Sequence, residues 1–173
     1  MKLVFFAYTN FGYQCVEFAN KQCKHEILVV SAPYDKGEPI NNWESVVSYS
    51  RNHDIPFILN PKNKIIPEVI EKVISFLPDM VFSCTYPLII PGSILKATKH
   101  GGLNFHGGIL PYYRGCLSGV WSILNGESES GVTLHYMDES FDTGDVVEIR
   151  KVKILPSDTA FSLYEKTREI SFN

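Results

Sequence analysis

The sequence has no run of about 20 apolar residues and no large excess of charge of one sign. Without such a run no membrane-spanning helix is predicted, and the apolar run after Lys2 is too short for the core of a signal peptide. A formal net charge of −3 over 173 residues gives no support for a nucleic-acid-binding surface. These absences favour a cytoplasmic protein that binds neither a membrane nor nucleic acid.

Patterns typical of a metal site or a dinucleotide cofactor are also missing. None of the four cysteines forms a CxxC pair, so we expect reduced thiols rather than disulfides. The first expected strand is not followed by Gly-x-Gly-x-x-Gly, which argues against a bound dinucleotide. The histidines outside the main motif lie on unrelated segments without the spacing of metal ligands: His25, His53, His100 and His135. No metal site is predicted.

Apolar runs alternate with segments of helical spacing through the first half of the chain. We expect strands at residues 3–7, 26–31, 55–59 and 79–83. A turn is expected at 8–12, followed by a helix with Val16, Ala19 and Cys23 on one side. Further helices are expected at 43–53, 65–76 and 91–98, with a loop at 32–42. Pro56 places the third strand at a sheet edge. The alternation predicts one α/β domain over residues 1–173, with a Rossmann-like, mostly parallel sheet and helices on both faces.

The second half of the chain changes character after a strand that contains Asn104. A helix at 118–125 ends at Asn-Gly, and the alternating segments at 131–137 and 145–154 predict an antiparallel extension of the sheet near the C-terminus. A last helix begins near Thr159, with Ser157 or Asp158 as its cap. We expect it to be still running at Asn173, which would make the chain a fragment of a longer protein.

Asn104 and His106 stand two residues apart in the segment that we interpret as a short strand. Residues i and i+2 of a strand point to the same face, so an amide and an imidazole would project side by side. Gly107 and Gly108 then end the strand. A third partner is expected in the acidic loop at 136–145. Two polar residues satisfied by the backbone would give the same pair, but the added carboxylates favour an active site.

Polar residues follow three of the expected strands directly. They are the segments 8–10 and 84–86 and the residue His106. In parallel α/β sheets, ligands bind at the carboxyl ends of the strands. We therefore expect these three positions to converge on one crevice.

A series of short segments in the second half carries a recognisable pattern: Asn104-Phe-His106, Leu110-Pro111, Tyr113-Arg-Gly115, Asn125-Gly126, Gly131-Val-Thr-Leu-His135 and Asp142-Thr-Gly-Asp145. With these segments the sequence resembles the folate-dependent formyltransferases, which include glycinamide ribonucleotide, methionyl-tRNA and nucleotide-sugar formyltransferases. The resemblance covers nearly the whole chain and is strongest between residues 101 and 147. The segments 6–12 and 78–83 are most similar to the nucleotide-sugar branch, such as the domain that acts on UDP-4-amino-4-deoxy-L-arabinose.

The resemblance implies catalytic roles for Asn104, His106 and Asp142, and N10-formyltetrahydrofolate as co-substrate. Asn104 and a protonated His106 would donate hydrogen bonds to the oxyanion that forms on the formyl oxygen. Asp142 would orient His106 or help to accept the amine proton. The resemblance also implies a pterin pocket formed by two segments: Tyr86, Pro87, Leu88, Ile89 and Ile90 after the fourth strand, and Met137, Asp138, Glu139, Ser140 and Phe141 in the acidic loop.

Two positions depart from the family pattern. Gly108-Ile109 stands where Ser-Leu is usual, which alters the stiffness of the loop without removing a catalytic side chain. Cys116 stands where the 4-amino-arabinose enzymes carry a further arginine. The second difference leaves the identity of the sugar undecided.

Five further residues have both a functional and a structural interpretation. Tyr8 and Asn10 either contact the acceptor or are plain turn residues. Arg114 either holds a substrate phosphate as a bidentate fork or is a surface residue. Trp43 and Trp121 are expected to pack rather than to stack on a ligand.

We therefore expect a cytoplasmic N-formyltransferase that acts on a nucleotide-linked amino sugar in lipopolysaccharide biosynthesis, with a homodimer as the candidate assembly. One alternative is a methionyl-tRNA formyltransferase, which the acidic balance and the lack of a visible basic extension disfavour. The other is a non-catalytic folate-binding module. The intact Asn, His and Asp set argues against it.

Overall fold

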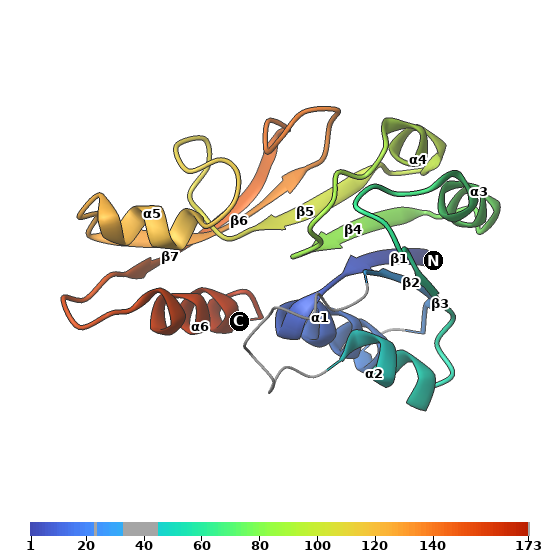
Figure 1. Cartoon of the computed structure of the whole chain (residues 1–173), viewed down its shortest axis with the longest axis horizontal. Coiled ribbons are helices and arrows are strands. Elements are labelled where there is room, and N and C mark those ends of the chain that lie inside the picture. Colours follow the sequence, from blue (N-terminus) through green and yellow to red (C-terminus); the bar gives the residue numbers. More distant parts are fainter. Residues whose placement is uncertain (23, 33–44, 173) are drawn as a thin grey trace. The chain divides into compact units, whose positions relative to one another are not determined.

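The computed structural model describes residues 1–22, 24–32 and 45–172 (Figure 1). The chain divides into two compact units, unit 1 at residues 1–103 and unit 2 at residues 104–173. The strands follow one another in the sheet order β3-β2-β1-β4-β5-β6-β7. This is the expected mostly parallel α/β sheet with an antiparallel pair near the C-terminus.

In the described residues of unit 1 there are four parallel strands, as the apolar runs predict. They are β1 (Lys2–Ala7), β2 (Glu26–Ser31), β3 (Phe57–Leu59) and β4 (Met80–Cys84). β1 pairs with β2 and β4, and β2 pairs with β3. Val4 and Phe6 of β1 are fully buried, which is the burial that a continuous apolar strand requires. β3 is an edge strand, in agreement with the position of Pro56.

Four helices cover this part of the sheet. They are α1 (Thr9–Gln22), α2 (Val46–Asn52), α3 (Pro67–Ser75) and α4 (Gly92–Ala97). In Figure 1, α1 and α2 lie together on one face, and α3 and α4 lie together on the other. Pro67 is the first residue of α3, where its missing N–H costs nothing.

The expected turn at residues 8–12 is wrong, because α1 begins directly after β1. Thr9, the first residue of α1, has a φ of 60°. The Gly12 N–H donates to the Tyr8 carbonyl at 3.1 Å. A Cβ atom at Gly12 would lie 3.0 Å from the Ala7 carbonyl carbon, so glycine lets the helix start against the strand. Cys23, most of the loop at 32–42 and Trp43 lie outside the described residues.

Unit 2 is built around a long antiparallel hairpin. β5 (Gly102–His106) crosses the boundary between the units. α5 (Ser118–Leu124), β6 (Glu129–Tyr136), β7 (Val146–Lys153) and α6 (Ala160–Ile170) follow. β6 and β7 are antiparallel, with an irregularity in the register between Leu134 and His135. α6 packs on both strands, and the buried Leu163 contacts Gly119 of α5.

Both ends of α6 differ from expectation. Thr159 is the cap, because its hydroxyl accepts from the Ser162 N–H at 3.1 Å while the Ser162 hydroxyl accepts from the Thr159 N–H at 3.0 Å. Asp158 instead pairs with Lys166. The helix ends at Ile170 with Ser171 as its C-cap, well before Asn173. Among the described residues, no helix is both long enough and apolar enough to cross a membrane.

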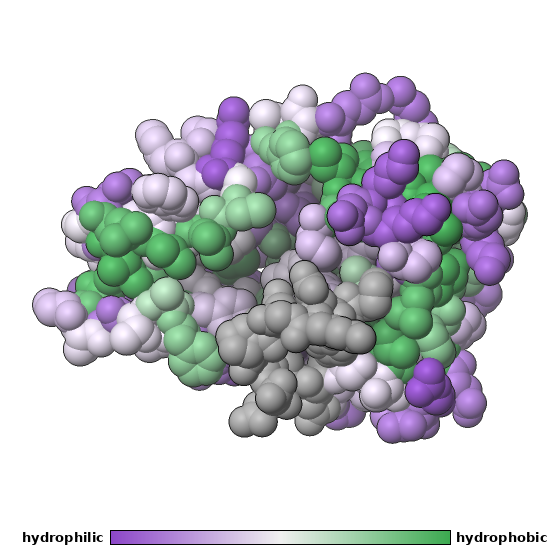
Figure 2. Space-filling view, viewed as in Figure 1, coloured by the Kyte–Doolittle hydropathy of each residue, from purple (hydrophilic) through white to green (hydrophobic). Residues whose placement is uncertain are grey.

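Helix α5 carries exposed apolar side chains. Leu117 precedes it, and Trp121 and Leu124 follow at helical spacing; all three are more than half exposed. Figure 2 shows a hydrophobic area at the left of the view, over the place that α5 has in Figure 1. Trp121, which we expect to pack rather than to stack on a ligand, is 55% exposed.

Candidate active site

Asn104 and His106 lie on β5 and both approach the carboxylate of Asp142. The Asn104 Nδ2 atom donates to Asp142 Oδ1 at 3.2 Å, and His106 Nδ1 lies 3.4 Å from Asp142 Oδ2. The His106 ring is buried, and the Asp142 side chain is only 13% exposed. The structure thus brings together the three residues that the sequence singles out, all within unit 2.

The loop between β6 and β7 holds Asp142 in place. Its backbone φ is 51°, a left-handed conformation that aspartate adopts more readily than most residues. The Gly115 N–H donates to Asp142 Oδ2 at 2.8 Å. A Cβ atom at Gly144 would lie 1.9 Å from the Tyr136 carbonyl oxygen. Only glycine permits this approach, so the Asp-Thr-Gly sequence is a requirement of the loop.

The far side of the His106 ring also faces hydrogen-bond acceptors. Its Nε2 atom lies 2.5 Å from the Tyr113 carbonyl oxygen and 3.3 Å from the Ser118 hydroxyl. A carbonyl oxygen can only accept, so Nε2 carries a proton. A second proton on Nδ1 would lie between the ring and the Asp142 carboxylate. The surroundings of His106 therefore suit a ring that donates hydrogen bonds.

The sequence analysis missed the place of His135 in this site. The ring is 2% exposed. Its Nε2 atom lies 3.0 Å from Asn104 Nδ2 and 3.4 Å from Asp142 Oδ1, and its Nδ1 atom lies 2.8 Å from the Tyr136 carbonyl oxygen. The spacing of His135 from the other histidines is not that of a metal site, so its spacing alone indicates no functional role. The alternation of β6, which puts His135 and the buried Thr133 on one face, was the available signal.

Asn104 is held through its amide nitrogen. Asp142 and His135 are both within reach of Nδ2, and the amide oxygen makes no hydrogen bond to the part of the chain that the structure describes. The resemblance implies that Asn104 donates to an oxyanion. That role would require one of its N–H groups to leave Asp142 or His135.

Thr133 and Ser118 fix the loop that follows β5. The Thr133 hydroxyl donates to the Gly108 carbonyl at 2.6 Å and accepts from the Leu110 N–H at 3.2 Å. A Cβ atom at Gly108 would lie 2.7 Å from the Ser118 Cβ and 2.9 Å from His106 Nε2. The departure from the usual Ser-Leu pattern is therefore matched by Ser118, which occupies the space beside residue 108.

The neighbours of Asp142 keep its carboxyl group ionised. Burial, the largest single influence, raises its pKa, but a hydrogen bond from His135 when that ring is protonated, the Gly115 N–H and the charge of His106 together outweigh burial. The net effect is that the pKa of Asp142 is lowered from its ordinary value. The site therefore contains a carboxylate at neutral pH, next to two histidines.

The two segments implied for the pterin pocket lie in different units. In unit 1, residues 86–90 follow β4, with Tyr86 and Ile90 buried and Ile89 exposed. In unit 2, residues 137–141 lead into the loop of Asp142, and Phe141 is exposed. Asp138 stabilises that loop by accepting from the Ser140 N–H at 2.8 Å. In each segment, taken by itself, one large apolar side chain is exposed: Ile89 in unit 1 and Phe141 in unit 2.

The candidate acceptor residues are placed as follows. In unit 1, the Tyr8 N–H donates to the Cys84 carbonyl at 3.2 Å, so the carboxyl ends of β1 and β4 lie side by side. Asn10 lies in the first turn of α1 rather than in a free turn. In unit 2, Arg114 is exposed and makes no ion pair with the residues that the structure describes.

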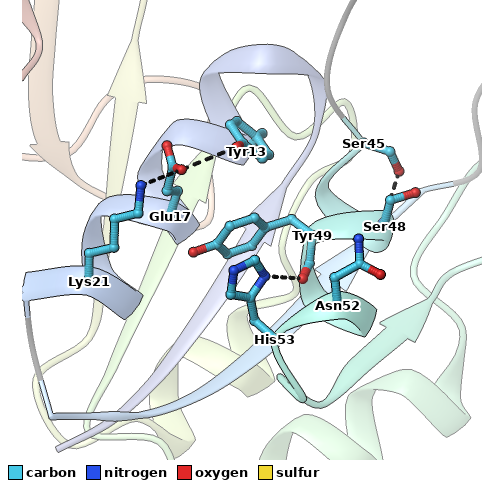
Figure 3. A pocket seen from close by; sticks show the side chains of 8 residues that line it. All are labelled: Tyr13, Glu17, Lys21, Ser45, Ser48, Tyr49, Asn52 and His53. Atoms are coloured by element: carbon cyan, nitrogen blue, oxygen red, sulfur yellow. Dashed lines mark hydrogen bonds and ion pairs between the residues drawn. The ribbon is translucent and has the colours of Figure 1, made fainter.

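A cavity of about 370 Å³ lies between α1 and α2 in unit 1 (Figure 3). Its side chains largely bind one another: Lys21 pairs with Glu17 at 2.7 Å, and His53 stacks on Tyr49 with 4.0 Å between ring centroids. It contains none of the residues that the sequence predicted for the site. We assign no ligand to it.

Comparison with known proteins identifies the family. A family model described as formyl transferase matches residues 1–172. The bifunctional polymyxin resistance protein ArnA of Wigglesworthia glossinidia brevipalpis is 36% identical over 166 residues, which are 96% of this chain and 25% of that protein. The GDP-perosamine N-formyltransferase of Brucella melitensis is 47% identical over 92 residues, 53% of this chain and 36% of that protein.

A solved N-formyltransferase structure from Helicobacter canadensis, a complex with folinic acid and dTDP-3-aminofucose, is 26% identical with a TM-score of 0.74; the match covers 98% of this chain and 59% of that one. Methionyl-tRNA and phosphoribosylglycinamide formyltransferases are also among the similar proteins. The chain spans less than half the length of either curated relative above. With the family model matching residues 1–172, the chain belongs to the formyl transferase family.

Proposed function

We propose that this protein transfers a formyl group from N10-formyltetrahydrofolate to the amine of a nucleotide-linked amino sugar, in the cytoplasm. The observation that carries the proposal is the Asp142 carboxylate, which Asn104 and His106 approach from one strand. An amide, an imidazole and a carboxylate are the groups that acyl transfer to an amine requires. No covalent enzyme intermediate is needed.

The residues of the site divide the proton handling between them. As the amine attacks, negative charge develops on the formyl oxygen, and His106 donates a hydrogen bond or a proton to it from Nε2. This donation requires the Nε2–H group to leave the Tyr113 carbonyl oxygen. One such donor is typically worth about 3–4 kcal/mol. Asp142, ionised and only 13% exposed, accepts the proton that the amine loses, directly or through one water molecule. The folate, when bound, supplies the activated formyl carbon.

The residues present fit a folate. Ile89 and Phe141 are exposed apolar side chains on the two segments that the resemblance assigns to the pterin. Backbone carbonyl and amide groups of residues 86–90 and 137–141 would pair with the polar edge of the ring. The solved Helicobacter canadensis relative is described as a complex with folinic acid, which supports a folate as the donor.

The nucleotide-sugar acceptor rests on the relatives and on Arg114. The names of two relatives, GDP-perosamine N-formyltransferase and the N-formyltransferase in complex with dTDP-3-aminofucose, each contain an amino sugar that is linked to a nucleotide. Arg114 has no ionic partner among the described residues, so its guanidinium is free to bind a phosphate. Tyr8 and Asn10 remain candidates for contact with the acceptor. The net charge of −3 disfavours tRNA.

A direct assay separates the candidates. The full-length protein is incubated with N10-formyltetrahydrofolate and GDP-, UDP- and dTDP-linked amino sugars, and in parallel with charged initiator tRNA. We expect formylation of at least one sugar, with a weak dependence on salt because few phosphates are neutralised. Transfer to tRNA alone, with a steep salt dependence, would overturn the sugar assignment. Folate binding without transfer to any acceptor would indicate the non-catalytic module.

A further inference from the structure

His135 has two ring nitrogens with different partners. The Nδ1 atom faces the Tyr136 carbonyl oxygen at 2.8 Å. The Nε2 atom faces Asn104 Nδ2 at 3.0 Å. Since a carbonyl oxygen can only accept, the Nδ1 atom carries the proton, and in a neutral ring the Nε2 atom is then a bare acceptor.

The Asn104 amide has one orientation that satisfies these neighbours. Asp142 Oδ1 lies 3.2 Å from the same nitrogen that approaches His135. A carboxylate oxygen and a bare imidazole nitrogen are both acceptors, and an amide NH₂ group has two hydrogens to donate. A flipped amide would set its oxygen against the carboxylate and leave both acceptors without a donor.

A second arrangement is a charged His135 that donates from Nε2 to Asp142. The distance between these atoms is 3.4 Å, longer than the 3.0 Å between Nε2 and the Asn104 amide. That arrangement would also bring two donors, Nε2–H and the amide N–H, against each other. In the neutral ring the Nε2 atom accepts from the Asn104 amide at 3.0 Å and makes no hydrogen bond to Asp142, and this is the arrangement that we adopt.

We propose that His135 is a positioning residue that anchors the Asn104 amide by its nitrogen and thereby presents the Asn104 oxygen to the acceptor amine. This inference rests on the proposed function. The oxygen makes no hydrogen bond to the described residues, so it is available to accept an N–H of the incoming amine. The ionisable side chains of the same cluster are Asp142, His106 and His135 itself.

The anchored oxygen would act most strongly in the transition state. A neutral amine attacks with its lone pair and retains two N–H bonds. One N–H donated to Asn104 would aim the lone pair at the formyl carbon. As the new C–N bond forms and the folate C–N bond breaks, the amine nitrogen becomes positive, and its hydrogen bond to Asn104 strengthens. The amine proton leaves to Asp142, and Asp142 returns it, directly or through water, to the folate nitrogen as that nitrogen leaves the formyl carbon.

Two substitutions at residue 135 distinguish anchoring from simple packing. His135→Gln can place a side-chain oxygen near the position of Nε2 and so keeps an acceptor for Asn104, whereas His135→Leu fills the space without one. We expect His135→Leu to lower kcat at least tenfold with little change in the KM for the folate, and His135→Gln to recover most of that loss. His100→Gln, an exposed histidine in unit 1, is the matched control.

Ring NMR on the unmodified protein tests the anchor without any substitution. With ¹⁵N-labelled histidine, we expect His135 to have a protonated Nδ1 and a bare Nε2 at assay pH. In Asn104→Ala, only the Nε2 signal should shift. A protonated Nε2, or equal activity of the Leu and Gln variants in an enzyme that transfers formyl groups, would overturn the inference. If the wild type transfers a formyl group to none of the acceptors, the proposed function is refuted. The ring spectrum would still show whether His135 Nε2 accepts from the Asn104 amide.

Discussion

Gly108 lies so close to Ser118 that a Cβ atom on the glycine would be 2.7 Å from the serine Cβ. The same atom would be 2.9 Å from His106 Nε2. Real Cβ contacts are not this short, so any side chain at 108 must push α5 or the catalytic ring aside. Glycine at this position is therefore a condition for the placement of His106.

We expect Gly108→Ala to lower kcat at least tenfold, because overpacking typically costs about 1–3 kcal/mol and here displaces the His106 ring. The matched control is Gly107→Ala, since a Cβ atom there meets nothing within 4 Å. Adding Ser118→Gly to Gly108→Ala removes one of the two clashes and should restore part of the activity. Equal kcat in Gly108→Ala and Gly107→Ala would contradict the explanation.

His106→Ala and Asp142→Asn should each reduce formyl transfer by about 10²–10⁴-fold, the usual range for a lost general acid or base. Both variants should remain folded, since Asp142→Asn keeps an oxygen for the Gly115 N–H. Steady-state kinetics and circular dichroism on the purified proteins check both points. Turnover within threefold of the wild type in either folded variant would falsify the assigned roles.

The stability of the protein should depend on the ionisation of Asp142 in acid. The pKa of Asp142 is lower in the folded protein than its ordinary value of 3.8, so folding favours the carboxylate. The resulting stabilisation is complete above the unfolded-state pKa and is lost as the pH falls through the folded-state pKa. We therefore expect the free energies of unfolding of wild type and Asp142→Asn to approach each other below about pH 4. Urea titrations between pH 6 and pH 3 measure this difference in the free energy of unfolding. A difference that grows as the pH falls would contradict the prediction.

Thr133→Val should destabilise the protein by about 1–3 kcal/mol, because it leaves the buried Gly108 carbonyl and Leu110 N–H without a partner. Ser130→Ala, on the same strand, is the control. The Ser130 hydroxyl is buried and has no hydrogen-bond partner among the described residues, so its removal should change the free energy of unfolding by less than about 0.5 kcal/mol. Urea denaturation of both variants measures the two changes in the free energy of unfolding. Equal changes would contradict a stabilising role for the two hydrogen bonds of Thr133.

The sequence predicts those parts of the fold and site that depend on local pattern. Two-residue alternation is enough to put Asn104 and His106 on one face, and the apolar runs mark β1 and β2 almost to the residue. The Asp142-Thr-Gly-Asp145 motif identifies the loop that carries Asp142.

Features that depend on tertiary contacts were missed. His135 joins the site only because β6 lies close to Asn104, and Ser118 matters only because residue 108 has no side chain. Neither partnership has a fixed spacing in the sequence. The start of α1 was also missed, since Thr9 and Asn10 are equally common in turns and the close fit of Gly12 against Ala7 is invisible in one dimension.

The register irregularity in the hairpin restricts where the chain can tolerate insertions and deletions. Leu134 pairs with Glu148 and His135 with Val146, so Val147 is the extra residue on β7. A length change between residues 142 and 147 would move Asp142 out of phase with β6, even if both strands still paired. Among natural or designed variants, the segment between Asp142 and Val147 should therefore keep its length even where its residues change.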